Sequence, residues 1–140
     1  MSNRFQILSL DGGGIKGLFS AAILAHLEED LNINVSDYFD LIVGTSTGGI
    51  IALGLGLGMK PHDIVHFYVG KGQAIFPGSI ITNLRKYWRN KFDASPLENA
   101  LKECFNDKLL GESKKRLVIP SYNLGDDDVY LIQDCSSRAA

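Results

Sequence analysis

The chain has 140 residues, 45% of them hydrophobic, which is enough for one domain with a buried core. Fourteen basic and sixteen acidic residues give a formal net charge of -2, so no excess positive charge favours nucleic acid as a partner. Two cysteines are too few for a disulfide framework, and the N-terminus lacks the residue order of a signal peptide. We therefore expect a cytoplasmic protein.

The first predicted elements are a strand and a helix. Phe5 to Leu10 is a short apolar run that ends at a glycine-rich turn, as in a strand buried on both faces. From Gly17 the apolar residues recur with helical spacing. The apolar face of this helix is predicted to contain Ile23, Leu24, Leu27 and Leu31, and its charged face Glu28, Glu29 and Asp30.

Residues 41–59 carry no charged side chain, which by hydropathy alone would suggest a membrane span. The stretch begins as a β-rich run and is then interrupted by Gly-Thr-Ser-Thr-Gly-Gly, which no continuous transmembrane helix would favour. We predict a strand from Phe39 to Val43, a sharp turn, and a buried helix from Thr47 to Gly58.

The second half of the chain contains further helix and strand signals. Pro61 is placed to open a helix to about Val69, and residues 70–80 are rich in Gly and Pro, as in a loop. A capping box with proline at the first helical position predicts a helix over 95–105. Strands are predicted over 116–122 and 129–133, joined by an acidic turn. The order predicts an α/β domain with a mostly parallel β-sheet flanked by helices.

The clearest chemical motif is Gly44-Thr45-Ser46-Thr47-Gly48, which fits Gly-x-Ser-x-Gly between a strand and a helix. In such an elbow the nucleophile occupies a strained turn, and only small residues fit two positions away on either side. The following helix directs its N-terminal amides toward Ser46, which favours a developing anion. Ser46 is the predicted nucleophile. Thr45 and Thr47 are interpreted as residues that fill the turn.

The first turn, from Asp11 to Gly17, contains Gly-x-Gly-x-x-Gly, which is also the dinucleotide-binding fingerprint. That interpretation needs an acidic residue at the end of the second strand, where the sequence has the Ser46 motif instead. The alternative is that the amides of Gly12, Gly13 and Gly14 form an oxyanion hole. Both turns follow parallel strands, so we expect them at one edge of the sheet.

Together, Asp-Gly-Gly-Gly-Ile-Lys-Gly and Gly-Thr-Ser-Thr-Gly-Gly resemble the opening of the patatin-like phospholipases. Leu117-Val118-Ile119-Pro120 and the closing Ser137-Arg138-Ala139-Ala140 are similar to later segments of the family, with less specificity. The resemblance implies a Ser-Asp dyad that hydrolyses acyl lipids, with Ser46 as nucleophile, Gly12, Gly13 and Gly14 in the oxyanion loop, and no metal or other cofactor.

The family's catalytic aspartate belongs to a later Asp-Gly-Gly or Asp-Gly-Ala motif. The one Asp-Gly pair of this sequence, Asp11-Gly12, lies in the first loop. We therefore expect residues 1–140 to be the N-terminal part of a single, truncated patatin-like domain, inactive without the rest. The three aspartates from Asp126 to Asp128 are interpreted as a solvated turn.

Other chemically capable residues are given structural roles. His62 and His66 imitate a zinc-protease helix, but no third ligand suggests itself, so surface or packing roles are preferred to a metal. His26, one turn from Glu29, fits a polar face. Cys104 fits a core position, and Cys135 has no partner of catalytic type nearby.

The segment from Arg85 to Lys91 combines cations with aromatic residues and suits an anionic lipid surface. The alternative is an ordinary solvated segment with inward-packed aromatics. The residues available for peripheral membrane contact are Arg85, Lys86, Trp88, Arg89 and Lys91. A non-catalytic interaction or regulatory module on the same fold is the main rival to the enzyme, and a nucleotide-binding domain is a weaker one.

Overall fold

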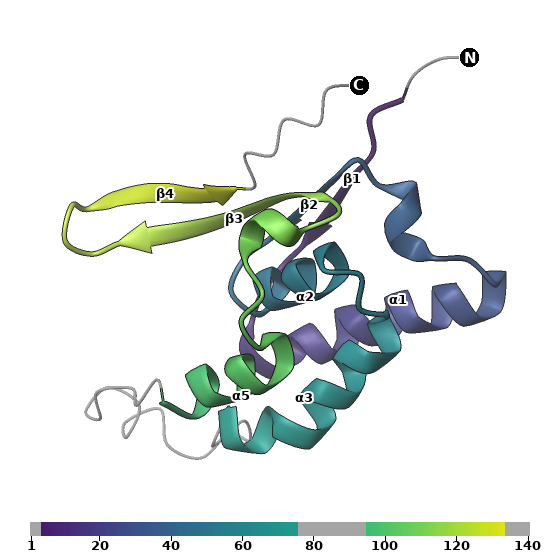
Figure 1. The fold of residues 1–140 in the computed structure, drawn as a ribbon, viewed down its shortest axis with the longest axis horizontal. Helices are drawn as coiled ribbons and strands as arrows, with labels where there is room; N and C mark the ends of the chain where they lie inside the picture. The colour runs from purple at the N-terminus through teal and green to yellow at the C-terminus, as the bar shows by residue number, and fades with distance from the viewer. Residues whose placement is uncertain (1–3, 76–94, 134–140) are drawn as a thin grey trace.

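The structure, a computed structural model, describes residues 4–75 and 95–133. Its centre is a four-stranded sheet in the order β1-β2-β3-β4 (Figure 1). The strands are β1 (Ile7–Leu10), β2 (Leu41–Gly44), β3 (Arg116–Asn123) and β4 (Asp128–Gln133). The segment from Arg85 to Lys91, Cys135 and the closing Ser-Arg-Ala-Ala lie outside the described residues.

The first three strands run parallel, and β4 returns antiparallel to β3 as a hairpin. Leu10 pairs with Gly44, so β1 and β2 end side by side at the same edge of the sheet. The next strand extends this edge, because Val43 pairs with Val118 of β3. The prediction of a mostly parallel α/β sheet is confirmed. Its register places the glycine loop and the Ser46 turn together.

Figure 1 shows the described helices gathered on one side of the sheet. The helix α2 lies directly on the strands and contacts β1, β2 and β3, while α1 and α3 pack against α2 and against each other. The helices are α1 (Gly17–Leu31), α2 (Thr47–Gly56), α3 (Pro61–Ile75) and α5 (Ser95–Phe105), with 3-10 turns η1 (Gly14–Lys16), η2 (Val35–Tyr38) and η3 (Leu110–Glu112).

The uncharged stretch over 41–59 is the strand β2 followed by the helix α2. Its side chains are apolar because α2 lies between the sheet and the outer helices, where Ile51 and Ala52 are fully buried against Ile42 of the neighbouring strand. The expected strand, turn and buried helix are confirmed. Among the described residues, no helix has the length and apolar composition to cross a membrane.

Two details of the helices differ from the sequence predictions. Three residues assigned to the apolar face of α1, Ile23, Leu27 and Leu31, are exposed, and its buried positions are Gly17, Ala21 and Leu24. The spacing identified an apolar side of the helix, but spacing cannot show whether another element covers that side. Second, residues 70–75, predicted as loop, continue α3 although they include Gly70 and Gly72, because each glycine costs a helix only about 1 kcal/mol.

Candidate active site

Ser46 occupies the turn between β2 and α2 and has φ 53 and ψ -122, a conformation that a residue with a side chain rarely adopts. Because such a conformation is costly, it persists only where the surrounding structure enforces it. The side chain is exposed at the end of the strand. The backbone geometry expected of a nucleophile elbow is therefore present at Ser46.

Close backbone packing explains the glycines on either side of Ser46. A Cβ atom at Gly44 would collide with the carbonyl group of Gly48, and one at Gly48 would collide with the carbonyl group of Leu10. These neighbours are main-chain atoms of the first turn of α2 and of the end of β1, so they cannot easily move aside. The spacing of the motif thus follows from the approach of β1, β2 and α2 around one turn.

The glycine loop lies directly against the elbow. A Cβ atom built on Gly12 would lie 2.6 Å from the Cβ atom of Ser46, and Gly12 also abuts the carbonyl group of Thr45. The next glycine, Gly13, has φ 147 and ψ 47, and Gly14 has φ 61, both conformations that favour glycine. The two motifs therefore meet at one site, as the parallel sheet predicts.

The two threonines do more than fill the turn. The N-H group of Gly12 donates to the Thr45 hydroxyl oxygen at 3.1 Å, and that of Gly13 donates to the Thr47 hydroxyl oxygen at 3.2 Å. The interpretation of both threonines as residues that fill the turn did not include these hydrogen bonds. The available signal was the glycine loop itself, whose amides need acceptors that no regular element supplies.

Thr47 is buried and held from two directions. Its side chain lies 3.0 Å from the position that a Cβ atom of Gly17 would occupy, which explains the last glycine of the loop motif. Its carbonyl oxygen accepts a hydrogen bond of 2.9 Å from the hydroxyl group of Tyr68 on α3. Sequence reasoning missed Tyr68, although a tyrosine on a core-facing helix needs a partner for its hydroxyl group.

Burial raises the pKa of Tyr68 well above its ordinary range, and the neighbouring Cys104 thiol adds to the rise. Tyr68 is therefore a neutral hydrogen-bond donor in the folded protein. Cys104 is half-buried on α5, its sulfur 4.0 Å from that of Met59, and burial raises the pKa of its thiol too. Both groups are packed and protonated, unlike an activated nucleophile.

Some amides at the site keep their hydrogen-bonding capacity. Within residues 4–75 and 95–133, the N-H groups of Gly14 and Thr47 donate to no protein acceptor. The later amides of α2 are occupied, since Gly48 donates to Thr45 and Gly49 to Ser46, both over 2.9 Å. One open N-H group thus remains on the glycine loop, at Gly14, and another at the start of α2, at Thr47, the residue after the exposed Ser46.

The aspartates that could assist Ser46 lie in two places. Asp11 is exposed and precedes the glycine loop. Asp126 and Asp127 lie in the turn of the β3-β4 hairpin and Asp128 begins β4; the hairpin projects away from the helices in Figure 1. There Asp126 accepts from Tyr130 at 2.9 Å and Asp127 contacts Tyr122. These contacts fit a structural turn of exposed residues.

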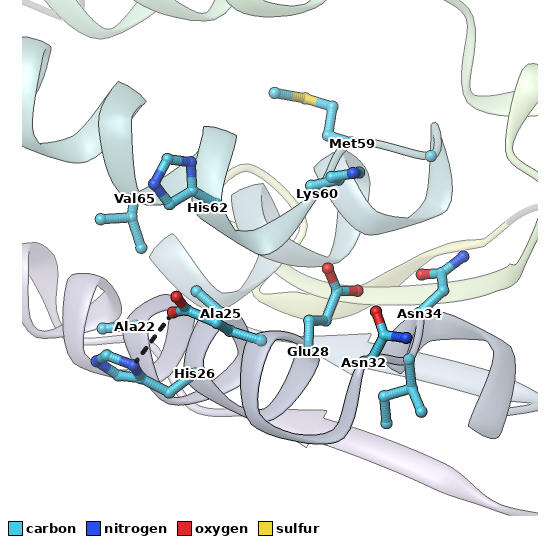
Figure 2. Close-up of a pocket in the computed structure, with 13 residues that line it drawn as sticks. Ala22, Ala25, His26, Glu28, Asn32, Asn34, Met59, Lys60, His62 and Val65 are labelled. Carbon is cyan, nitrogen blue, oxygen red and sulfur yellow. Dashed lines mark ion pairs between the residues drawn. The ribbon is translucent and has the colours of Figure 1, made fainter.

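A separate groove of about 820 Å³ lies between the C-terminal half of α1 and the start of α3. Figure 2 shows Glu28 and Lys60 facing each other across it, and His26 paired with Glu29 over 3.9 Å. The groove contains no residue of the glycine loop or the elbow, because the loop precedes the opposite end of α1. Its acidic and basic side chains are mixed, and it is not the site of Ser46.

The two remaining histidines are exposed near the start of α3. The rings of His62 and His66 contact each other edge to face, with centroids 4.5 Å apart. Across the described part of the chain, no three His, Cys, Asp or Glu side chains gather as a metal site would require. An edge-to-face pair of surface rings accounts for the spacing that imitates a zinc motif.

Comparison with known proteins agrees with the geometry. The model of the patatin-like phospholipase family matches residues 8–138. A cGAMP-activated phospholipase of Pseudomonas aeruginosa is 36% identical over 85% of this chain and 36% of its own length. The corresponding protein of Vibrio cholerae is 34% identical over 89% of this chain and 39% of its own.

Plant proteins are similar to the same extent. Patatin-like protein 4 of Arabidopsis thaliana is 34% identical over 87% of this chain and 35% of its own length. The chain therefore spans between a third and two fifths of the curated relatives it matches. With an elbow at Ser46, a glycine loop against it and a family match over nearly the whole chain, this chain belongs to the patatin-like phospholipase family.

Proposed function

We propose that the protein containing this chain is a serine-dependent lipid acyl hydrolase with Ser46 as its nucleophile. The observation that carries the proposal is the backbone of Ser46, whose φ of 53 at a strand-to-helix turn exposes the hydroxyl group beside the glycine loop. A serine with only a structural role in a turn would have no need of so costly a backbone conformation. The names of the relatives, several of them phospholipases, support acyl lipids as the substrate class.

In this mechanism the Ser46 oxygen attacks the ester carbonyl carbon, and its proton passes to an aspartate outside residues 1–140. The carbonyl oxygen becomes an oxyanion, which the loop Gly12 to Gly14 receives through its amides. Gly14 and Thr47 have the open N-H groups, and the positive end of the α2 dipole adds to their effect. The aspartate gives that proton to the departing alcohol, and water, deprotonated by the same aspartate, then hydrolyses the acyl-Ser46 ester and restores the serine hydroxyl group.

The substrate is part of a lipid surface, so the enzyme must reach that surface from the aqueous side. We propose a cytoplasmic protein that binds membranes peripherally through Arg85, Lys86, Trp88, Arg89 and Lys91, which lie outside the described residues. Reversal of these charges should weaken binding to anionic vesicles at low salt, and high salt should remove the difference. Equal binding by both proteins at low salt would contradict this role.

The direct test is Ser46→Ala in the full-length protein, assayed with a fluorogenic acyl ester. The variant should lose several orders of magnitude in kcat, because the attacking oxygen is gone, while its melting temperature should stay close to that of the parent. Ser121→Ala on β3 is the matched control, since Ser121 is also an exposed serine. It should retain full turnover.

The rival from another functional class is a non-catalytic interaction or regulatory module with the same fold. It predicts no serine-dependent turnover in the full-length protein and no covalent labelling of Ser46 by an acyl phosphonate. Labelling of the parent that disappears in Ser46→Ala would support the hydrolase. Turnover that survives Ser46→Ala would place the chemistry elsewhere.

A further inference from the structure

We propose that Thr45 and Thr47 are positioning residues that clamp the glycine loop onto the nucleophile. Each hydroxyl oxygen accepts the N-H group of one loop glycine, Gly12 at 3.1 Å and Gly13 at 3.2 Å. Since these threonines are the neighbours of Ser46 in the chain, the loop and the nucleophile are held as one unit. The catalytic meaning of the clamp rests on the proposed function, whereas the clamp itself does not.

The loop needs such a clamp because its own sequence gives it no stiffness. Three consecutive glycines lose more conformational entropy on ordering than any other residues would. The conformation at Gly13, with φ 147, is one that glycine alone adopts readily. Within the loop, the described main-chain hydrogen bond from Lys16 to the Gly13 carbonyl group is long, at 3.3 Å. Contacts from outside must therefore fix its position.

The strained backbone of Ser46 explains why two threonines can act together. In a regular strand, the side chains of residues 45 and 47 would point to the same face, whereas consecutive N-H groups of a neighbouring extended segment point in alternate directions. Two such side chains would not both reach adjacent amides. Here the turn at Ser46 lets Thr45 bind one amide and Thr47 bind the next. The strain that exposes the nucleophile also orients the clamp.

The two threonines are supported differently. Thr47 is buried, and Tyr68 on α3 holds its carbonyl group, so its side chain is fixed by the core. Thr45 is exposed, and its own N-H group donates to the Leu10 carbonyl oxygen at 3.1 Å, which ties the elbow to the end of β1. Thr47 is thus the rigid half of the clamp and Thr45 the accessible half.

For the reaction, the consequence is that the loop amides have two different roles: two bind the threonines, and the next remains open. By holding Gly12 and Gly13, the threonines fix the direction of the next N-H group, that of Gly14, which has no acceptor among the described residues. A misplaced donor stabilises an oxyanion poorly, because this stabilisation depends on preorganised geometry. Loss of the clamp should therefore affect kcat more than KM.

The test compares isosteric and conservative substitutions in the full-length protein. Thr45→Val and Thr47→Val remove each hydroxyl group at nearly constant volume, while Thr45→Ser and Thr47→Ser keep it. The Val variants should lower kcat about tenfold with KM little changed, as expected for one lost hydrogen bond. The Ser variants should restore most of the loss. A merely structural role would lower the melting temperature without this selective rescue.

Hydrogen-deuterium exchange tests the clamp without reference to catalysis. Amides in the peptide spanning 11–17 should exchange faster in the Val variants than in the parent and the Ser variants. If Thr47→Val unfolds the protein, Thr45→Val still provides the test, because Thr45 is exposed. Unchanged exchange in Thr45→Val would overturn the clamp. If Ser46→Ala keeps its turnover but exchange changes as expected, the proposed function fails and the clamp stands.

Discussion

The elbow at Ser46 and the β3-β4 hairpin are both turns after β-strands, yet different forces hold them. At the elbow, main-chain atoms of β1, β2 and α2 approach so closely that Gly44 and Gly48 leave no room for a Cβ atom. In the hairpin, residues 121–133 are all exposed, and polar side chains organise the turn. A turn made by backbone packing tolerates little change, whereas a solvated turn tolerates much.

The contrast predicts its largest effect at Gly48. Gly48→Ala should destabilise the protein by about 3 kcal/mol, because the new methyl group would overlap the carbonyl group of Leu10 at the end of β1. Urea denaturation of the variant and the parent measures the difference in unfolding free energy. A change below about 1 kcal/mol would show that the elbow is as adaptable as the hairpin.

Gly70→Ala is the matched control for that substitution. Gly70 lies within α3, and a Cβ atom there would meet no atom within 4 Å beyond the adjoining backbone of its own helix. The change should stabilise the protein by about 0.5 to 1 kcal/mol, because alanine loses less backbone entropy in a helix. If the unfolding free energy falls in Gly48→Ala and rises in Gly70→Ala, the effect at Gly48 comes from close packing and not from replacing a helical glycine in itself.

An intermediate effect is expected at Tyr68, which ties α3 to the elbow. Tyr68→Phe removes the hydrogen bond from the Tyr68 hydroxyl group to the Thr47 carbonyl group, which should cost about 1 kcal/mol. The same urea experiment measures it. If the loss is absent, Tyr68 does not support the elbow, and the start of α2 is held by the glycine contacts alone.

The Tyr68 effect should also depend on pH. Burial raises the pKa of Tyr68 in the folded state above the ordinary value of about 10, so folding disfavours its ionisation. A raised pKa contributes stability below the unfolded value that is lost as the pH rises above it. The stability of the parent should therefore fall more steeply than that of Tyr68→Phe above about pH 10. If the stability of the parent and of Tyr68→Phe falls equally with pH, the Tyr68 hydroxyl group is not buried as described.

The elbow could be predicted from sequence because its glycines have a local physical cause at a fixed spacing. Gly44, Ser46 and Gly48 are specified by one turn between one strand and one helix, so the motif and its context were sufficient. The parallel register then placed the glycine loop beside it without further information. Predictions of this kind succeed where the chain itself carries the constraint.

Contacts between distant segments could not be predicted in the same way. The role of Tyr68 depends on a carbonyl group 21 residues earlier, and nothing in its own helix identifies that partner. The hydroxyl groups of Thr45 and Thr47 likewise act on a loop whose position only the folded sheet defines. On α1, the helical spacing of Ile23 and Leu27 predicts the helix, but their exposure depends on whether another element packs against that face.

The smallest effect is expected in the hairpin, where Asp126, Asp127 and Asp128 are the acidic rivals for the role of general base. Their replacement together by Asn should change the unfolding free energy by only about 0.5 kcal/mol, because the turn is exposed and Asn tolerates the positive φ of Asp127. Turnover of the full-length protein should also be unchanged, since the proposed base lies outside residues 1–140.

Turnover by residues 1–140 alone, measured beside the full-length protein, completes this test. Without its aspartate, Ser46 keeps a hydroxyl group that is almost fully protonated near neutral pH, so the shorter chain should be inactive on lipid esters. Asp126 and Asp127 already bind Tyr130 and Tyr122 within the hairpin, which ties their carboxylates to the turn. Comparable rates for both proteins, removed by the triple Asn substitution, would instead make the hairpin part of the active site and end the distinction between the two turns.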